Sequence, residues 1–106
     1  MDLKALGENL GLELHEFVEI VELFLSTADT DIEKIRRAAL GNDTGTAAEA
    51  AHSLKGSAGN LGFKEISDIA LKAENSASEG SLEGFADITN ILIEKVKEIK
   101  TALNQV

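Results

Sequence analysis

The sequence predicts an all-α fold, an antiparallel up-down four-helix bundle preceded by a short extra N-terminal helix. Apolar residues recur at intervals of three and four through most of the 106 residues, which is the period of amphipathic helices. No stretch alternates with a period of two for long enough to predict a strand. Proline is absent, so no proline interrupts a long helix. Long helices joined by short polar turns favour an antiparallel bundle, and we expect residues 1–106 to form one domain.

The first predicted helix is short and covers about residues 2–9, with Asp2 as its N-cap. The second is long and covers about residues 13–40, and we expect it to be looser at residues 26–30 and to end at Gly41. Its apolar face is formed by Leu14, Phe17, Val18, Val21, Phe24, Leu25, Ala28, Ile32, Ile35 and Ala39.

The third helix is predicted over about residues 44–61. Its start has two candidate caps, because Asp43 can cap it directly and Thr46 can form a capping box with Glu49. Gly62 is placed to end it. The sequence leaves the choice between the two caps open.

Two further helices are predicted over about residues 63–78 and 82–104, with Ser81 as the cap of the second. The fourth helix carries apolar residues at spacings of three and four, and so does the fifth. The aromatic residues lie in these apolar stripes and are expected in the core: Phe17, Phe24, Phe63 and Phe85.

The composition excludes several classes of function. The formal net charge is −9, from 19 acidic against 10 basic residues, whereas nucleic acids and anionic membrane surfaces require a basic binding surface. Cysteine is absent, so there are no disulfides and no thiolate chemistry. The N-terminus does not resemble a signal peptide, and no apolar run approaches the roughly 20 residues of a membrane span. We therefore expect a cytoplasmic protein.

One face of the third helix is almost bare around His52. At about 100° per residue, Gly56, Gly59 and Ala48 all lie within about 40° of His52, and Lys55 lies about 60° away. The apolar stripe is on the opposite side of the helix and includes Ala47, Ala50, Leu54, Ala58 and Leu61. Each glycine inside a helix costs about 0.5–1 kcal/mol relative to alanine. This face needs no close packing within the molecule, so we expect a partner to approach it.

The surroundings of His52 favour a nucleophilic imidazole. A metal site requires several ligands, but the other histidine, His15, is far away in the sequence and is expected to be solvated. Glu49 could orient the ring as in a catalytic triad, but no hydroxyl completes the set. The glycine-rich stretch matches no nucleotide-binding pattern. A histidine can instead accept a phosphoryl group covalently, and the Lys55 ammonium would stabilise its charge.

The stretch Ala51–Gly62, which reads AHSLKGSAGNLG, resembles the signature of the histidine-containing phosphotransfer (HPt) domains of two-component phosphorelays. The matching positions are His52, Lys55 three residues on, Gly56 four on and Gly59 seven on. The chain length and the helix pattern are similar to that family as well. The resemblance implies that Nε2 of His52 accepts and donates the phosphoryl group and that Lys55 supports it electrostatically. It also implies that partners dock over Ala48, Gly56 and Gly59.

The resemblance further implies a phosphoryl carrier without kinase activity and without a cofactor of its own. Its partners would be the receiver domains of response regulators, which supply Mg²⁺, and a sensor histidine kinase. The motif requires no dimer, and we expect a monomer. Two alternatives remain open, namely an HPt domain of a larger hybrid sensor kinase and a helical adaptor that works without phosphorylation.

Overall fold

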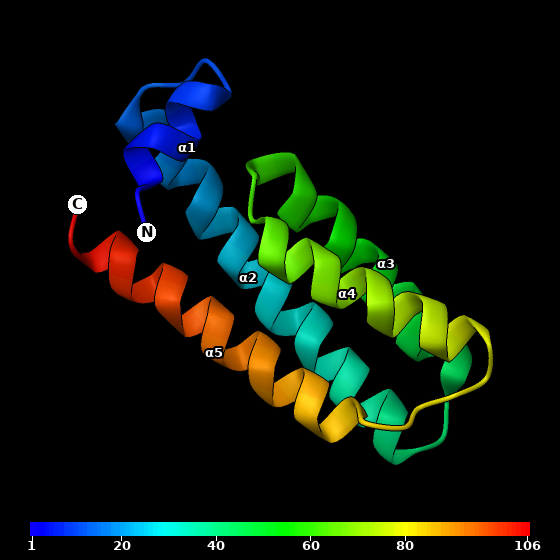
Figure 1. Ribbon diagram of the computed structural model, residues 1–106. Helices are drawn as coiled ribbons and strands as arrows, with labels where there is room; N and C mark the ends of the chain where they lie inside the picture. The colour runs from blue at the N-terminus through cyan, green and yellow to red at the C-terminus, as the bar shows by residue number, and fades with distance from the viewer.

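Five helices make up the chain in the computed structural model, which describes residues 1–106. They are α1 (Leu3–Asn9), α2 (Leu14–Leu40), α3 (Thr44–Leu61), α4 (Lys64–Ser78) and α5 (Phe85–Asn104). Helix α2 runs away from α1, α3 returns, α4 runs away again and α5 returns, so that both termini lie near the α1 end (Figure 1). The predicted all-helical bundle with a short N-terminal helix is confirmed.

Helix α3 has extensive contacts with two other helices. It packs mainly against α4 and also against α2, while α5 packs chiefly on α2 and only slightly on α4. The bundle is elongated, with extents of 42 × 21 × 17 Å. None of its helices is both long enough and apolar enough to cross a membrane.

The core is apolar and follows the periodicity of the sequence. The four phenylalanines expected inside are all buried, and the Phe63 ring centroid lies 5.2 Å from that of Phe24 and 6.4 Å from that of Phe17. Small residues dominate the buried face of α3, which includes Leu54. The largest fully buried side chains are Phe17, Phe85, Ile35, Leu54, Leu92, Ile99 and Val21.

Helix α3 begins and ends at well-defined residues. Asp43 is its N-cap, because Oδ1 accepts a hydrogen bond from the backbone N–H of Thr46 at 3.0 Å and Oδ2 accepts one from the Thr46 hydroxyl at 2.7 Å. At the other end Gly62 adopts a left-handed conformation with φ 85°, which glycine adopts without steric cost. The choice between the two candidate caps is therefore settled in favour of Asp43.

Helix α2 is continuous, so the expected looser stretch at residues 26–30 is wrong. The hydroxyls of Thr27 and Thr30 donate to the carbonyls four residues earlier, those of Leu23 and Ser26, within the intact helix. The polar residues of this stretch lie on the exposed face, and the buried face continues through it. Burial of that face keeps the helix together where the local sequence alone is weak.

The start of α5 also differs from the prediction. The helix begins at Phe85 instead of residue 82, and Ser81 is not its cap. The Ser81 hydroxyl accepts a hydrogen bond from the Glu83 N–H at 3.3 Å, inside the preceding turn. That turn contains Gly80 and Gly84, both with positive φ, and the left-handed Gly84 directly precedes the helix.

We predict that Leu54→Ala destabilises the protein by about 2–5 kcal/mol, because it removes a fully buried side chain and leaves a cavity. Leu54 is 0% exposed. The measurement is urea-induced unfolding followed by circular dichroism. Leu23→Ala is the control, since Leu23 is 72% exposed and its loss should change the stability by no more than about 0.5 kcal/mol. Equal effects of the two substitutions would contradict the described core.

Candidate functional site

His52 lies in the middle of α3 with its side chain pointing out of the bundle. The side chain is 66% exposed, whereas Ala51 and Leu54 are 0% exposed. This is the orientation predicted from the spacing of the helix. Burial of the opposite face of α3 therefore presents the imidazole to solvent.

A carboxylate from another helix holds the imidazole. Oε2 of Glu74, on α4, lies 2.6 Å from Nδ1 of His52. Oε1 of the same carboxylate lies 2.7 Å from Nζ of Lys55, and this Nζ is 3.3 Å from Nδ1. The Glu74 and Lys55 side chains are 19% and 29% exposed. The three residues form one cluster, which we call the His52–Lys55–Glu74 trio.

The hydrogen bonds assign the protons of the trio. An ionised carboxylate only accepts hydrogen bonds, so Nδ1 of His52 carries the proton and donates a hydrogen bond to Glu74. The other ring nitrogen, Nε2, makes no hydrogen bond within the protein and in the neutral ring keeps a free lone pair. In the neutral ring, Nε2 is therefore the nitrogen with an available lone pair.

The charge of Glu74 is stabilised within the trio. Its hydrogen bond to the Lys55 ammonium is the main reason why the pKa of the Glu74 carboxyl lies below its ordinary value. Burial opposes this as the next-largest effect, and the hydrogen bond to His52 lowers the pKa further. The carboxyl is consequently ionised at neutral pH. Lys55 in turn balances the negative charge that Glu74 brings to the imidazole.

Glu74 was not predicted from the sequence. Glu49 was the predicted candidate for the acid beside His52, but it is exposed and makes no hydrogen bond to the ring. One feature of the sequence could have indicated Glu74. It directly follows Ala73, at the edge of the buried stripe of α4, where an acidic residue is unusual. Which residue of α3 it meets depends on the register of the two helices, and that register is not visible in the sequence.

The predicted docking residues have different surroundings. A Cβ atom built on Gly56 would meet nothing within 4 Å, whereas one on Gly59 would lie 3.2 Å from the hydroxyl of Ser67 on α4. Gly59 is exposed, yet it borders a close helix contact, contrary to the expectation that this face needs no internal packing. Ala48 is partly buried and packs against the core.

Hydrogen bonds from both neighbouring helices hold α3 near His52. The hydroxyl of Ser53 donates to the carboxylate of Asp31 on α2 at 2.8 Å, and Asp31 is only 5% exposed. The hydroxyl of Ser67 donates to the carbonyl oxygen of Lys55 at 3.0 Å. These bonds restrain rotation of α3 and hence the direction of the imidazole. Neither Asp31 nor Ser67 was predicted from the sequence.

The other histidine and one pocket lie outside the trio. His15 is exposed at the start of α2, where Nδ1 lies 3.4 Å from Oε2 of Glu13. No group of three or more histidine, aspartate or glutamate side chains is arranged to hold a metal ion.

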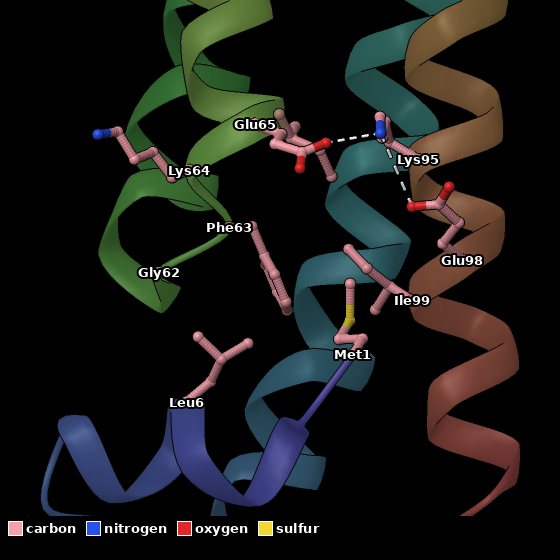
Figure 2. A pocket seen from close by; sticks show the side chains of 10 residues that line it. Met1, Leu6, Gly62, Phe63, Lys64, Glu65, Lys95, Glu98 and Ile99 are labelled. Carbon is pink, nitrogen blue, oxygen red and sulfur yellow. Dashed lines mark ion pairs between the residues drawn. The ribbon is translucent and has the colours of Figure 1, made fainter.

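A pocket of about 230 Å³ lies between α1, α4 and α5. Figure 2 shows the side chains of Leu6, Phe63 and Met1 converging there, with an ion pair between Glu65 and Lys95 at 2.6 Å beside them.

Comparisons with known proteins identify the family of the chain and bear out its fold. The sequence model of the Hpt domain matches residues 19–106. Histidine-containing phosphotransfer protein B from Pseudomonas aeruginosa PAO1 superposes with a TM-score of 0.82 at 19% identity, covering 97% of this chain and 87% of that chain. The HPT domain of a sensor hybrid histidine kinase from Shewanella gives a TM-score of 0.78 at 17% identity, with coverage of 99% and 91%. No curated protein sequence gives a significant match.

We predict that Glu74→Gln lowers the stability at neutral pH and that its deficit shrinks in acid. Because the folded-state pKa of Glu74 lies below the ordinary 4.5, its stabilising contribution is complete above that value and is lost as the pH falls through the folded-state pKa. Urea unfolding of both proteins between pH 7 and pH 3 measures this difference. Glu49→Gln removes the same charge where no hydrogen bond exists and should change the stability by no more than about 0.5 kcal/mol. A deficit that is independent of pH would contradict this account.

Proposed function

Because the chain belongs to the Hpt domain family, we propose that it carries a phosphoryl group between receiver-domain aspartates in a two-component phosphorelay, with His52 as acceptor and donor. The observation that carries the proposal is the geometry of the imidazole. Nδ1 is held by Glu74 at 2.6 Å, and Nε2 is unbonded on a side chain that is 66% exposed. A ring fixed in this way can present its lone pair to a phosphoryl group on another protein.

Neither phosphoryl transfer releases or takes up a free proton. The Nε2 lone pair attacks the phosphorus of the aspartyl phosphate, the P–O bond to the aspartate breaks, and its electron pair leaves on the carboxylate oxygen. Nδ1 keeps its proton, and Glu74 stabilises the positive charge that the phosphorylated ring acquires. In the second transfer the N–P bond breaks, its electron pair returns to Nε2, and the aspartate of another receiver takes the phosphoryl group.

Lys55 acts electrostatically in this scheme. Alone, the Glu74 carboxylate would repel an incoming phosphoryl group through the charge it places beside the ring. The Lys55 ammonium at 2.7 Å from Oε1 balances that charge, so the trio orients the imidazole without making the site anionic. The Mg²⁺ needed for the phosphoryl transfer is expected in the receiver domain, and no cofactor is assigned to this chain.

The receiver would dock over Ala48, Gly56 and Gly59. Gly56 is the strongest support for this docking surface. A glycine inside a helix lowers the helix stability by about 0.5–1 kcal/mol relative to alanine, and no contact within the molecule requires a glycine at this position. Such a contact must be transient, and we expect it to bury no more than about 1,200 Å². The protein would work as a cytoplasmic monomer.

We predict that His52→Gln abolishes phosphorylation, because glutamine offers no ring nitrogen as a nucleophile. The experiment incubates both proteins with a phosphorylated receiver domain and follows the labelled phosphoryl group. The wild-type product should be labile in acid and stable in base, as expected of a phosphoramidate. Failure of several receivers to phosphorylate the folded wild-type protein would favour the adaptor alternative. Unchanged transfer to His52→Gln would show that another residue accepts the phosphoryl group and would overturn the role of His52.

We predict that Gly56→Arg slows transfer at least about tenfold, because a long side chain on this open surface hinders docking and a loss of about 1.4 kcal/mol suffices for that factor. We choose Gly56 over Gly59 because a Cβ atom at Gly56 would have no neighbouring atom of the molecule within 4 Å. The control is Asn90→Arg, which adds the same charge at an exposed site on α5. Normal transfer by a folded Gly56→Arg protein would overturn the docking assignment.

A further inference from the structure

Gly59 and Ser67 form the contact between α3 and α4 on which this inference depends. The Ser67 hydroxyl occupies the space beside Gly59, 3.2 Å from where a Cβ atom would lie. The same hydroxyl donates to the carbonyl of Lys55 at 3.0 Å, so it rests directly on the backbone of α3. A side chain at Gly59 would have to displace this hydroxyl, or α4 with it.

Ser67 lies on the same face of α4 as Glu74. The two residues are seven positions apart, which is about two helical turns and a rotation of only about 20°. Both project toward α3, where Glu74 reaches Nδ1 of His52 at 2.6 Å and Nζ of Lys55 at 2.7 Å. The separation of the helices at Ser67 therefore contributes to the position of the Glu74 carboxylate.

We propose that Gly59 and Ser67 are positioning residues, which seat α4 against α3 so that the Glu74 carboxylate holds Nδ1 of His52 and leaves Nε2 free. The missing side chain of Gly59 admits the Ser67 hydroxyl, and the bond from that hydroxyl to Lys55 fixes the distance. This deepens the proposed phosphoryl-carrier function and rests on it for its biological meaning. The geometry itself can be tested without any phosphoryl transfer.

Two resonances report on the position of Glu74. The ¹⁵N shifts of the His52 ring at neutral pH distinguish a proton on Nδ1 from one on Nε2, and the ¹³C shift of the Glu74 carboxyl follows its titration. In the wild type the ring should be mainly in the Nδ1–H form. The pKa of Glu74 should lie below its ordinary value because Lys55 and His52 bind the charged form.

The test substitution is Gly59→Val, which adds bulk against Ser67. We expect the ratio of the Nδ1–H to the Nε2–H form to fall about tenfold, as loss of a charge-assisted hydrogen bond would cause, and the pKa of Glu74 to rise toward its ordinary value. Gly56→Val is the matched control, because it places the same residue in the same helix where no atom lies within 4 Å. It should leave both signals as in the wild type.

A milder substitution, alone and combined with a second one, keeps the proposal testable if Gly59→Val fails to fold. Gly59→Ala should shift the same signals less than Gly59→Val. Adding Ser67→Ala should bring them part of the way back, because without the hydroxyl the nearest side-chain atom is the Ser67 Cβ at 3.9 Å, although the bond to Lys55 is lost. Wild-type signals in folded Gly59→Val would overturn the proposal, as would equal shifts in Gly56→Val or no rescue by Ser67→Ala. If these shifts occur but the wild type accepts no phosphoryl group, the positioning role stands and the proposed function fails.

Discussion

The hydrogen bond between Glu74 and Nδ1 of His52 is the interaction on which the rest of the site depends. It connects α4 to the residue proposed to react, determines which ring nitrogen carries the proton, and can stabilise the charge of the phosphorylated ring. It also requires Lys55, because an unbalanced carboxylate would oppose the approach of an anionic group. The three side chains are therefore coupled, and the role of each depends on the other two.

The charge of the whole protein limits where the phosphoryl group can come from. The formal net charge is −9, and within the trio the Lys55 ammonium is already paired with Glu74 at 2.7 Å. The surface therefore has little attraction for a free phosphorylated anion at long range. Electrostatic interactions between exposed charges are screened over about 8–10 Å at physiological salt. A cation of a partner would therefore act on the phosphoryl group only at short range, which requires the partner to cover the bare surface at Gly56. This favours transfer inside a docked complex.

The sequence predicted most of the fold because its information is local. The period of the apolar residues locates each helix, and Asp43 and Gly62 mark the ends of α3. The direction of His52 follows from the same period. Glu74 and Asp31 were not predicted, because each is defined by a partner on another helix: Glu74 meets His52 and Asp31 meets Ser53. These pairings depend on helix register, which small buried residues leave weakly specified in the sequence.

Gly56 and Gly59 show the same limit in a single residue type. Both lie near His52 on one helical face, and the sequence treats them alike as surface left bare for a partner. In the structure Gly56 borders open space, while Gly59 borders the Ser67 hydroxyl. One glycine thus leaves room outside the molecule and the other leaves room for α4 within it. The proposed phosphoryl transfer needs both kinds of space, because a partner would reach Nε2 from outside while a carboxylate from the next helix holds Nδ1.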